Sequence, residues 1–316
     1  MIAAEPSGAD RLSLCVVILT YNEALHIGRA LASVSSIAEK VFVIDSGSKD
    51  DTVAIARAHG AEVLTHPFVN QAQQFQWAMD TCDIRSQWVL RLDADEIIEA
   101  DLAARLGEEL PRLPAHVAGV KLNRKHIFLG RWIRHGGRYP LTMLRVWRNG
   151  MARIENRWMD EHIYLLQGEA VTIEGGFADA NMHDIAFFID KHNKYATREA
   201  VDVLGKRYGL FSADPGVADD QGGQARRKRL LKEKLYNNLP FGTGPVLYFL
   251  FRYFIQMGFL DGREGAIYHG LQGLWYRFLV DARILEIDRE LRPLTTVPDK
   301  LQRLTELTGY TFAQAQ

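Results

Sequence analysis

The first third of the chain alternates between apolar segments of strand length and segments with helical periodicity. The strand-like segments are 12–19, 40–45, 61–66 and 87–93. Between the first two, apolar residues recur at helical spacing at Leu25, Ile27, Leu31 and Val34. Apolar strands that alternate with helices are typical of a parallel sheet covered by helices on both faces. The sequence therefore predicts an α/β fold.

Polar residues follow three of these strands. They are Tyr21 and Glu23 after the first strand, Asp45 at the end of the second, and Asp93 and Asp95 at the end of the fourth. In open parallel sheets, ligands bind beyond the carboxyl ends of the strands. We therefore expect these side chains to lie along one edge of the sheet and to form a binding site there.

Asp93 and Asp95 stand two residues apart at the end of an apolar strand. In an extended segment their side chains would point to the same side. Mg²⁺ and Mn²⁺ favour oxygen ligands, and Mg²⁺ typically takes one or two carboxylates and completes its shell with phosphates and water. The alternative is an acidic loop that is only solvated. We interpret the pair as a metal site that holds a diphosphate.

Asp45, Tyr21 and Glu23 are candidates for nucleotide contacts. The Asp45 carboxylate could accept a hydrogen bond from a nucleobase N–H or a ribose hydroxyl. Alternatively, it could accept the free N–H groups of the turn that follows it. Tyr21 could pack on a base, and Glu23 could enter the base pocket or cap the helix.

Composition excludes several classes of protein. The formal net charge of −1 provides no global field for nucleic acid, and two cysteines cannot build a disulfide framework or a zinc cluster. Residues 1–11 lack the features of a secretory signal and are expected to be flexible. There is no uninterrupted apolar run of about 18 residues that would suggest a membrane-spanning helix. We expect a cytoplasmic protein without a nucleic-acid partner.

Three stretches carry a family resemblance: VVILTYNEALHIGRALASV, VFVIDSGSKDDTVAIARAHGAEV and WVLRLDADEII. In order and spacing they resemble the family 2 glycosyltransferases of the GT-A fold, and residues 128–163 resemble the lipopolysaccharide-core and exopolysaccharide members. The resemblance implies a Rossmann-like, mostly parallel sheet with helices on both faces and a helical C-terminal extension. It implies a GT-A domain at 12–210, with a nucleotide-sugar half to about 115 and an acceptor half from 116. A loop at 211–225 and the extension at 226–316 would follow.

The resemblance implies roles for individual residues. Asp93 and Asp95 match the family's DXD motif, with Asp95 as the main metal contact. Asp45 matches the residue that meets the nucleotide base, although Ser46 stands where the family usually has a second acid. Gln74 lies in a stretch that is similar to one lining the donor pocket in this subgroup.

A catalytic base and a further metal ligand are also implied. Inverting transfer needs a carboxylate that takes the proton of the acceptor hydroxyl, and Asp160-Glu161 matches the family's acidic pair. Glu161 is the first choice and Asp160 the second; the alternative is a solvated turn or an ion pair with Arg157. His183 matches a histidine that serves some members as a metal ligand, preferably for Mn²⁺. Alternatively, His183 caps a helix or lies on the surface.

The implied function is transfer of a sugar from a nucleotide-diphosphate sugar to a glycan or lipid-linked acceptor, with Mg²⁺ or Mn²⁺, in cell-envelope polysaccharide biosynthesis. The alternative is a non-catalytic nucleotide-sugar-binding scaffold at the membrane. A sugar nucleotidyltransferase is disfavoured, because that class carries a Gly-rich basic loop where this chain has TYNEALHIG.

The C-terminal extension suggests a membrane surface as a partner. Its basic segment ARRKRLLKEKL precedes an aromatic-rich segment between Phe241 and Phe259, which Arg252 interrupts. Such segments can lie in the interface of an anionic membrane. The alternative is that they pack on the rest of the protein or on a second subunit. We expect a cytoplasmic protein that associates peripherally with the inner face of the plasma membrane.

Overall fold

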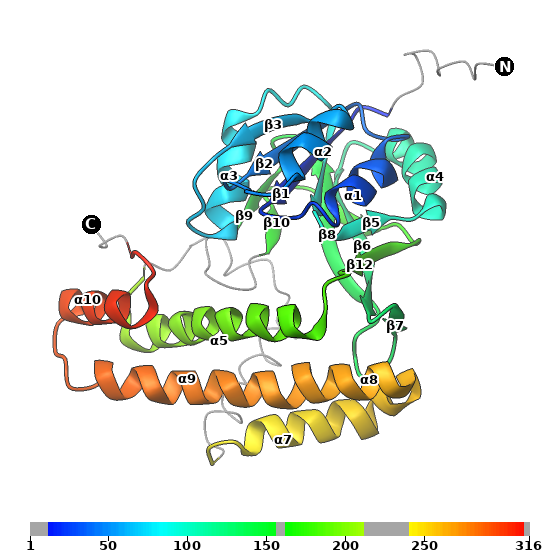
Figure 1. The fold of residues 1–316 in the computed structure, drawn as a ribbon. Coiled ribbons are helices and arrows are strands. Elements are labelled where there is room, and N and C mark those ends of the chain that lie inside the picture. Colours follow the sequence, from blue (N-terminus) through cyan, green and yellow to red (C-terminus); the bar gives the residue numbers. More distant parts are fainter. Residues whose placement is uncertain (1–11, 156–161, 212–239, 313–316) are drawn as a thin grey trace. The chain divides into compact units, whose positions relative to one another are not determined.

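The computed structural model describes residues 12–155, 162–211 and 240–312 (Figure 1). They fall into two compact units. The first holds the residues before His135 together with Arg138–Ile154 and His162–Met182; the second holds His135–Gly137 and the residues from His183 onward, with Glu155. The domain boundaries expected from the sequence stay predictions.

A sheet of ten strands forms the first unit. Its main path runs β3 (Glu62–Thr65), β2 (Lys40–Asp45), β1 (Leu14–Thr20), β4 (Trp88–Asp93), β8 (Leu141–Arg148), β6 (Val117–Phe128), β12 (Phe177–Ala180) and β5 (Glu96–Ile98). Two further strands, β7 (Arg131–Ile133) and β11 (Glu169–Thr172), pair with β6. A separate hairpin joins β9 (Ala152–Ile154) to β10 (Ile163–Leu165).

The first four strands are parallel, as the sequence predicts, because a helix connects each of them to the next. The rest of the sheet is mixed, since β8 runs antiparallel to both β4 and β6, whereas β12 runs parallel to β6. The predicted α/β class, with a helical C-terminal region, is confirmed.

Helices cover both faces of the parallel strands. On one face lie α1 (Ile27–Val34), α2 (Thr52–Ala58) and α4 (Ala100–Glu109), which the short helix η1 (Leu110–Arg112) extends; on the other lies α3 (Gln71–Thr81). Strand β1 contacts both layers, because alternate side chains point to opposite faces. Leu14, Val16 and Ile18 pack with the first layer, and Cys15 and Val17 with the second. Each fully buried large apolar side chain contributes about 1.5–3 kcal/mol.

Cys15 lies inside this core, with no exposed surface. Burial raises the pKa of its thiol to about 12, with Cys82 and Glu39 acting in the same direction. The thiol therefore stays protonated at neutral pH and is chemically inert there.

The second unit is helical. It contains α5 (Ile185–Tyr208), α7 (Thr243–Leu250), η3 (Phe251–Ile255), η4 (Gly258–Asp261), α8 (Gly262–Tyr268), η5 (His269–Trp275), α9 (Tyr276–Leu291) and α10 (Val297–Thr308). Helices α5 and α9 lie side by side (Figure 1), and buried residues of both, such as Ala200, Leu204 and Ile287, belong to one apolar cluster. Among the described residues, no helix has both the length and the apolar content needed to cross a membrane.

The loop His135–Gly137 belongs to this second unit, although it connects β7 to β8. Asp261 accepts the backbone N–H of His135 at 2.8 Å and pairs with His135 Nδ1 at 2.7 Å. Arg252 Nε donates to the carbonyl of Gly136 at 2.7 Å. Gly136 has a φ of +66°, and a Cβ there would lie 2.2 Å from the His269 ring. Only glycine therefore fits at this position.

Candidate functional site

The loops after β1 and β2 are joined by side chain–backbone hydrogen bonds. The backbone N–H of Asn22 donates to Ser48 Oγ, and the backbone N–H of Lys49 donates to Asn22 Oδ1, both at 2.8 Å. The N–H of Glu23 donates to Thr52 Oγ1 at 2.8 Å. Asn22 has a φ of +54°, a conformation that asparagine tolerates better than most residues. The bonds hold the two loops together at the carboxyl edge of the sheet.

Asp45 is 3% exposed and ends β2. Its Oδ2 accepts the backbone N–H groups of Gly47 and Ser48, both at 2.9 Å. This is the turn role that the sequence left as an alternative. Oδ1, however, is buried and has no hydrogen-bond partner among the described residues. The carboxylate can therefore serve the turn and still offer one oxygen to a ligand.

Gln74 reaches the same edge from α3 and is buried. Its Nε2 donates to Ser46 Oγ at 3.2 Å and to the carbonyl of His66 at 3.1 Å, and its Oε1 lies 2.7 Å from His66 Nδ1. One side chain thus holds the loops that follow β2 and β3. Gln74 contacts Ser46, the residue after Asp45, and its own polar atoms support these loops. Its predicted place in the donor pocket stays a prediction.

Asp93 and Asp95 lie at the end of β4, but the chain is not extended through them. Ala94 and Asp95 form the turn between β4 and β5, so strand alternation does not place the two carboxylates on one side. Asp95 Oδ2 accepts from Asn181 Nδ2 at 3.0 Å, and its carbonyl accepts the N–H of Ala180. The turn therefore presents Asp95 beside the end of β12.

Asp93 belongs to a cluster of buried charges. Its carboxylate lies 3.4 Å from Arg91 Nε and 3.4 Å from an Arg145 guanidinium nitrogen. The same Arg145 nitrogen donates to Glu96 Oε1 at 2.7 Å, and Arg124 lies 3.3 Å from that oxygen. Glu96 begins β5 rather than a helix, and its Oε2 accepts the N–H of Asp93 at 2.9 Å. The cluster therefore links β4, β5, β6 and β8.

The pKa values of Asp93 and Glu96 are shifted in opposite directions. Burial alone would raise the pKa of Asp93, but Arg91, Arg145 and Arg124 hold that pKa well below its usual range. Burial raises the pKa of Glu96 to about 7, against the opposing effect of Arg145. Asp93 is therefore an anion at neutral pH.

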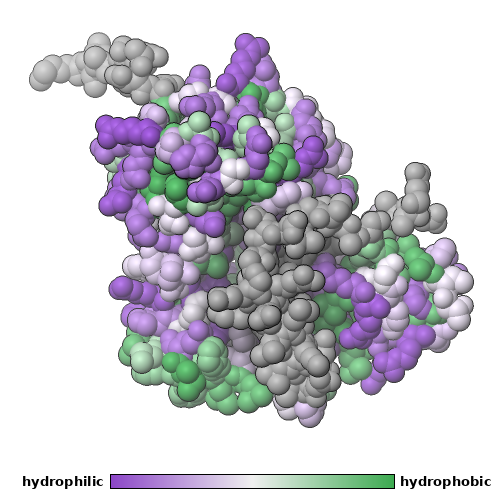
Figure 2. Space-filling model, turned by 180° about the vertical axis from the view of Figure 1, so that it is seen from behind, coloured by the Kyte–Doolittle hydropathy of each residue, from purple (hydrophilic) through white to green (hydrophobic). Residues whose placement is uncertain are grey.

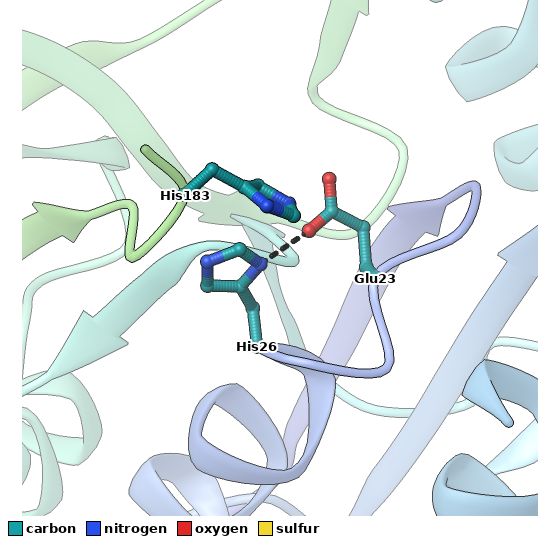
Figure 3. Close-up of side chains that lie close together, drawn as sticks. All are labelled: Glu23, His26 and His183. Atoms are coloured by element: carbon teal, nitrogen blue, oxygen red, sulfur yellow. Dashed lines mark hydrogen bonds and ion pairs between the residues drawn. The ribbon is translucent and has the colours of Figure 1, made fainter. Parts of the chain in front are cut away.

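Glu23 and His26 form the second polar group at the edge. Glu23 Oε2 lies 2.6 Å from His26 Nδ1, and His26 Nε2 accepts the backbone N–H of Met182 at 2.9 Å (Figure 3). Because Nε2 accepts a hydrogen bond, Nδ1 is the ring nitrogen that donates to Glu23 in this arrangement. His26 has no exposed surface. It connects the loop after β1 to the end of the first unit at Met182.

His183 follows Met182 directly in the chain and is the first residue of the second unit. Both nitrogens of His26 already take part in hydrogen bonds, so His26 offers no ligand atom to a cation in this arrangement (Figure 3). The metal role predicted for His183 stays a prediction.

Tyr21 and the acidic pair complete the predicted set. The Tyr21 side chain is 53% exposed in the loop after β1. An exposed ring at this point is accessible for packing on a base. Asp160 and Glu161 lie outside the described residues. Their roles therefore rest on the sequence alone.

Sequence reasoning missed the arginines of the charge cluster and the role of His26. Arg124 and Arg145 lie on strands that become neighbours only through the long-range order of the sheet, which no local pattern reveals. His26 did have a signal, since Glu23 and His26 stand three residues apart, a spacing at which side chains meet in a helical turn.

Comparisons with known proteins identify the family of this chain. The model described as "Glycosyl transferase family 2" matches residues 15–171. The chain belongs to glycosyl transferase family 2. An uncharacterized glycosyltransferase of Rickettsia bellii is 27% identical over 288 residues, which cover 89% of each chain. One of Rickettsia felis is 44% identical over 85 residues, 27% of this chain and 29% of the relative. The family resemblance of the sequence is confirmed.

A solved structure of a mannosyltransferase also aligns with this family 2 member. PcManGT from Pyrobaculum calidifontis, in complex with GDP-Man and Mn²⁺, is 13% identical, and the alignment covers 98% of this chain and 84% of that one. The TM-score is 0.41. This likeness is too low to say anything of substrate or metal.

The buried charge cluster predicts a contrast in stability. Arg145→Leu should lower the free energy of unfolding by about 3–5 kcal/mol, because it removes the buried guanidinium that pairs with both Glu96 and Asp93. Arg85→Leu removes a solvent-exposed pair with Asp83 and should change nothing measurable. Urea unfolding of both variants gives the comparison. Equal stability of Arg145→Leu and the wild type would contradict the role given to the cluster.

Proposed function

We propose that this family 2 member is a metal-dependent, inverting transferase. It moves a sugar from a nucleotide-diphosphate sugar to a glycan or lipid-linked acceptor in cell-envelope polysaccharide biosynthesis. The observation that carries the donor site is the buried Oδ1 of Asp45, which has no hydrogen-bond partner among the described residues.

A buried oxygen without a donor is energetically costly unless a ligand supplies one. A nucleobase N–H or a ribose hydroxyl would supply that donor at Asp45. Tyr21 is exposed in the neighbouring loop, and the bonds of Asn22 and Gln74 hold the surrounding loops in place. A rigid, polar edge of this kind suits a nucleoside, whose hydrogen-bonding groups must meet partners that are already in position.

Asp95 and Asp93 would hold the metal, with His183 as a further ligand. The donor set fits a hard cation, since Asp93 and Asp95 both offer carboxylate oxygens and Asp93 is ionised at neutral pH. When bound, Mg²⁺ or Mn²⁺ would neutralise charge on the leaving diphosphate. The assignment of Asp93-Ala94-Asp95 as the family's DXD motif is part of this proposal.

The acidic pair supplies the base. In an inverting transfer the acceptor hydroxyl attacks the anomeric carbon while a carboxylate takes its proton, and we assign that carboxylate to Glu161, with Asp160 as the second choice. The same proposal places the protein in the cytoplasm, peripherally on the inner face of the plasma membrane, where a lipid-linked acceptor would lie.

Asp45→Asn tests the donor site with little change in shape. The asparagine oxygen can still accept from Gly47 and Ser48, but its amide nitrogen replaces Oδ1 and faces the ligand's donor. Calorimetric titration with UDP, GDP and dTDP in the presence of Mn²⁺ should show wild-type binding of one nucleotide and a loss of roughly tenfold or more in the variant. Asp83→Asn, an exposed acid, is the control. Unchanged affinity in Asp45→Asn would remove Asp45 from the nucleotide site.

Asp95→Asn tests the metal. The wild type should bind its nucleotide more tightly with Mn²⁺ than without it, because the cation bridges the carboxylate and the diphosphate. The variant should bind equally weakly under both conditions. The same titration with and without Mn²⁺ measures this, and a metal effect of wild-type size in Asp95→Asn would refute the assignment.

Glu161→Gln separates binding from chemistry. The variant should keep the nucleotide affinity of the wild type and lose turnover by roughly 10²–10⁴-fold, because the amide cannot take a proton. Release of nucleotide diphosphate from the matching donor sugar reports turnover. Full turnover in Glu161→Gln together with loss in Asp160→Asn would move the base to Asp160. Nucleotide binding without turnover in the wild type would favour the scaffold.

A further inference from the structure

The second unit carries a concentration of exposed apolar side chains. Of the 22 large hydrophobic side chains that are exposed among the described residues, 12 lie between Phe241 and Phe278. Figure 2 shows hydrophobic surface gathered at its lower left, over the end of this unit that contains α7 and α8. A cluster of this size on a protein surface marks a place of contact with another molecule.

Six of these exposed residues form a continuous group along the chain. We call them the apolar stripe: Leu247, Leu250, Phe251, Phe254, Ile255 and Phe259. The first five follow the spacing of one face of a helix, and Ile255 is 70% exposed. Helix packing within the unit therefore leaves this face uncovered.

The stripe contains no exposed charged side chain. Arg252 is the only charged residue between Phe241 and Leu260, and it is 3% exposed. Its guanidinium donates to the Gly136 carbonyl at 2.7 Å and to Gln272 Oε1 at 2.6 Å, both within the second unit. A charge that would interrupt the apolar segment is thus turned inward and used in a structural contact.

We propose that the apolar stripe inserts into the interfacial layer of an anionic lipid bilayer. The face is rich in phenylalanine, uncharged and helical, which suits the boundary between headgroups and acyl chains. The segment 225–234 precedes the stripe in the chain and lies outside the described residues. It contains six Lys and Arg and one Glu, and this positive net charge favours an anionic surface. The inference deepens the proposed function, since it places the protein where a lipid-linked acceptor would be embedded.

The segment that carries the stripe also binds the loop His135–Gly137, which connects β7 to β8. Arg252 and Asp261, which are both buried, make these contacts. In this proposal the exposed side of the segment meets the bilayer, and its buried side positions a loop of the predicted acceptor half. Docking and loop position are therefore coupled through one short segment of chain.

Vesicle binding of the full chain, without donor or acceptor, tests the proposal. The wild type should co-sediment with vesicles of phosphatidylglycerol and phosphatidylcholine more than with phosphatidylcholine alone. Phe254→Glu/Ile255→Glu should lower the partition coefficient on the order of 30-fold, because two apolar side chains no longer enter the interface. Leu166→Glu/Leu285→Glu, which alters exposed leucines outside the stripe, should bind as the wild type does.

Three results would overturn the proposal. The first is no vesicle binding by the wild type, and the second is equal binding by Phe254→Glu/Ile255→Glu. The third is a wild type that self-associates in solution without binding vesicles and becomes monomeric in the variant, which would assign the stripe to a second copy of the chain. Nucleotide titration of the same proteins is independent of vesicle binding, so failure of the donor site and failure of this surface are distinguished.

A labelled protein gives a second measurement that does not require a charged substitution. Ile255→Cys in a Cys82→Ser background, labelled with an environment-sensitive fluorophore, should brighten and shift to shorter wavelength with anionic vesicles. Leu166→Cys in the same background should not change, and Cys15 is buried and does not compete for the label. An unchanged spectrum at position 255 would refute insertion of the stripe.

Discussion

The pairing of Arg145 with Glu96 and Asp93 is the interaction on which the site's architecture most depends. The guanidinium comes from β8, and the two acids come from the end of β4 and the start of β5. Three carboxylates, Asp93, Glu96 and Asp179, meet three arginines, Arg91, Arg124 and Arg145. The arginines stabilise the carboxylates against the cost of burial, which allows the cluster to exist at the end of a strand. The cluster also fixes the Ala94-Asp95 turn, because Glu96 accepts the N–H of Asp93.

The carboxyl edge of the sheet is organised by side chains that bind neighbouring loops. Asn22, Gln74 and His26 each connect two segments that are distant in sequence. Asp45 combines both roles, with one oxygen for its own turn and one left over. Loops that are held in this way lose little conformational freedom when a ligand binds, and so more of the interaction energy appears as affinity.

The helical unit uses its two sides differently. Its inner side holds the loop His135–Gly137 through Arg252 and Asp261, and its outer side presents the apolar stripe. Arg252 is the residue that makes both possible, since an outward guanidinium would place a charge in the stripe and leave the Gly136 carbonyl without its donor. Because the Arg252 side chain is buried, the stripe stays uncharged and the Gly136 carbonyl receives a hydrogen bond.

Much of the first half could be predicted from the sequence by itself. Strand-length apolar runs and helical spacing determined the parallel order of β1 to β4, and the position of Asp45 and Asp93 at strand ends determined that they lie at the carboxyl edge. Both patterns are local, and the rule that connects them to the fold is general. Only the tertiary structure decided that Glu96 is buried against Arg145 and Arg124, that Asp95 sits in a turn, and that Arg252 faces inward. Those outcomes depend on which strands and helices become neighbours across long stretches of chain, and no periodicity within one segment carries that information.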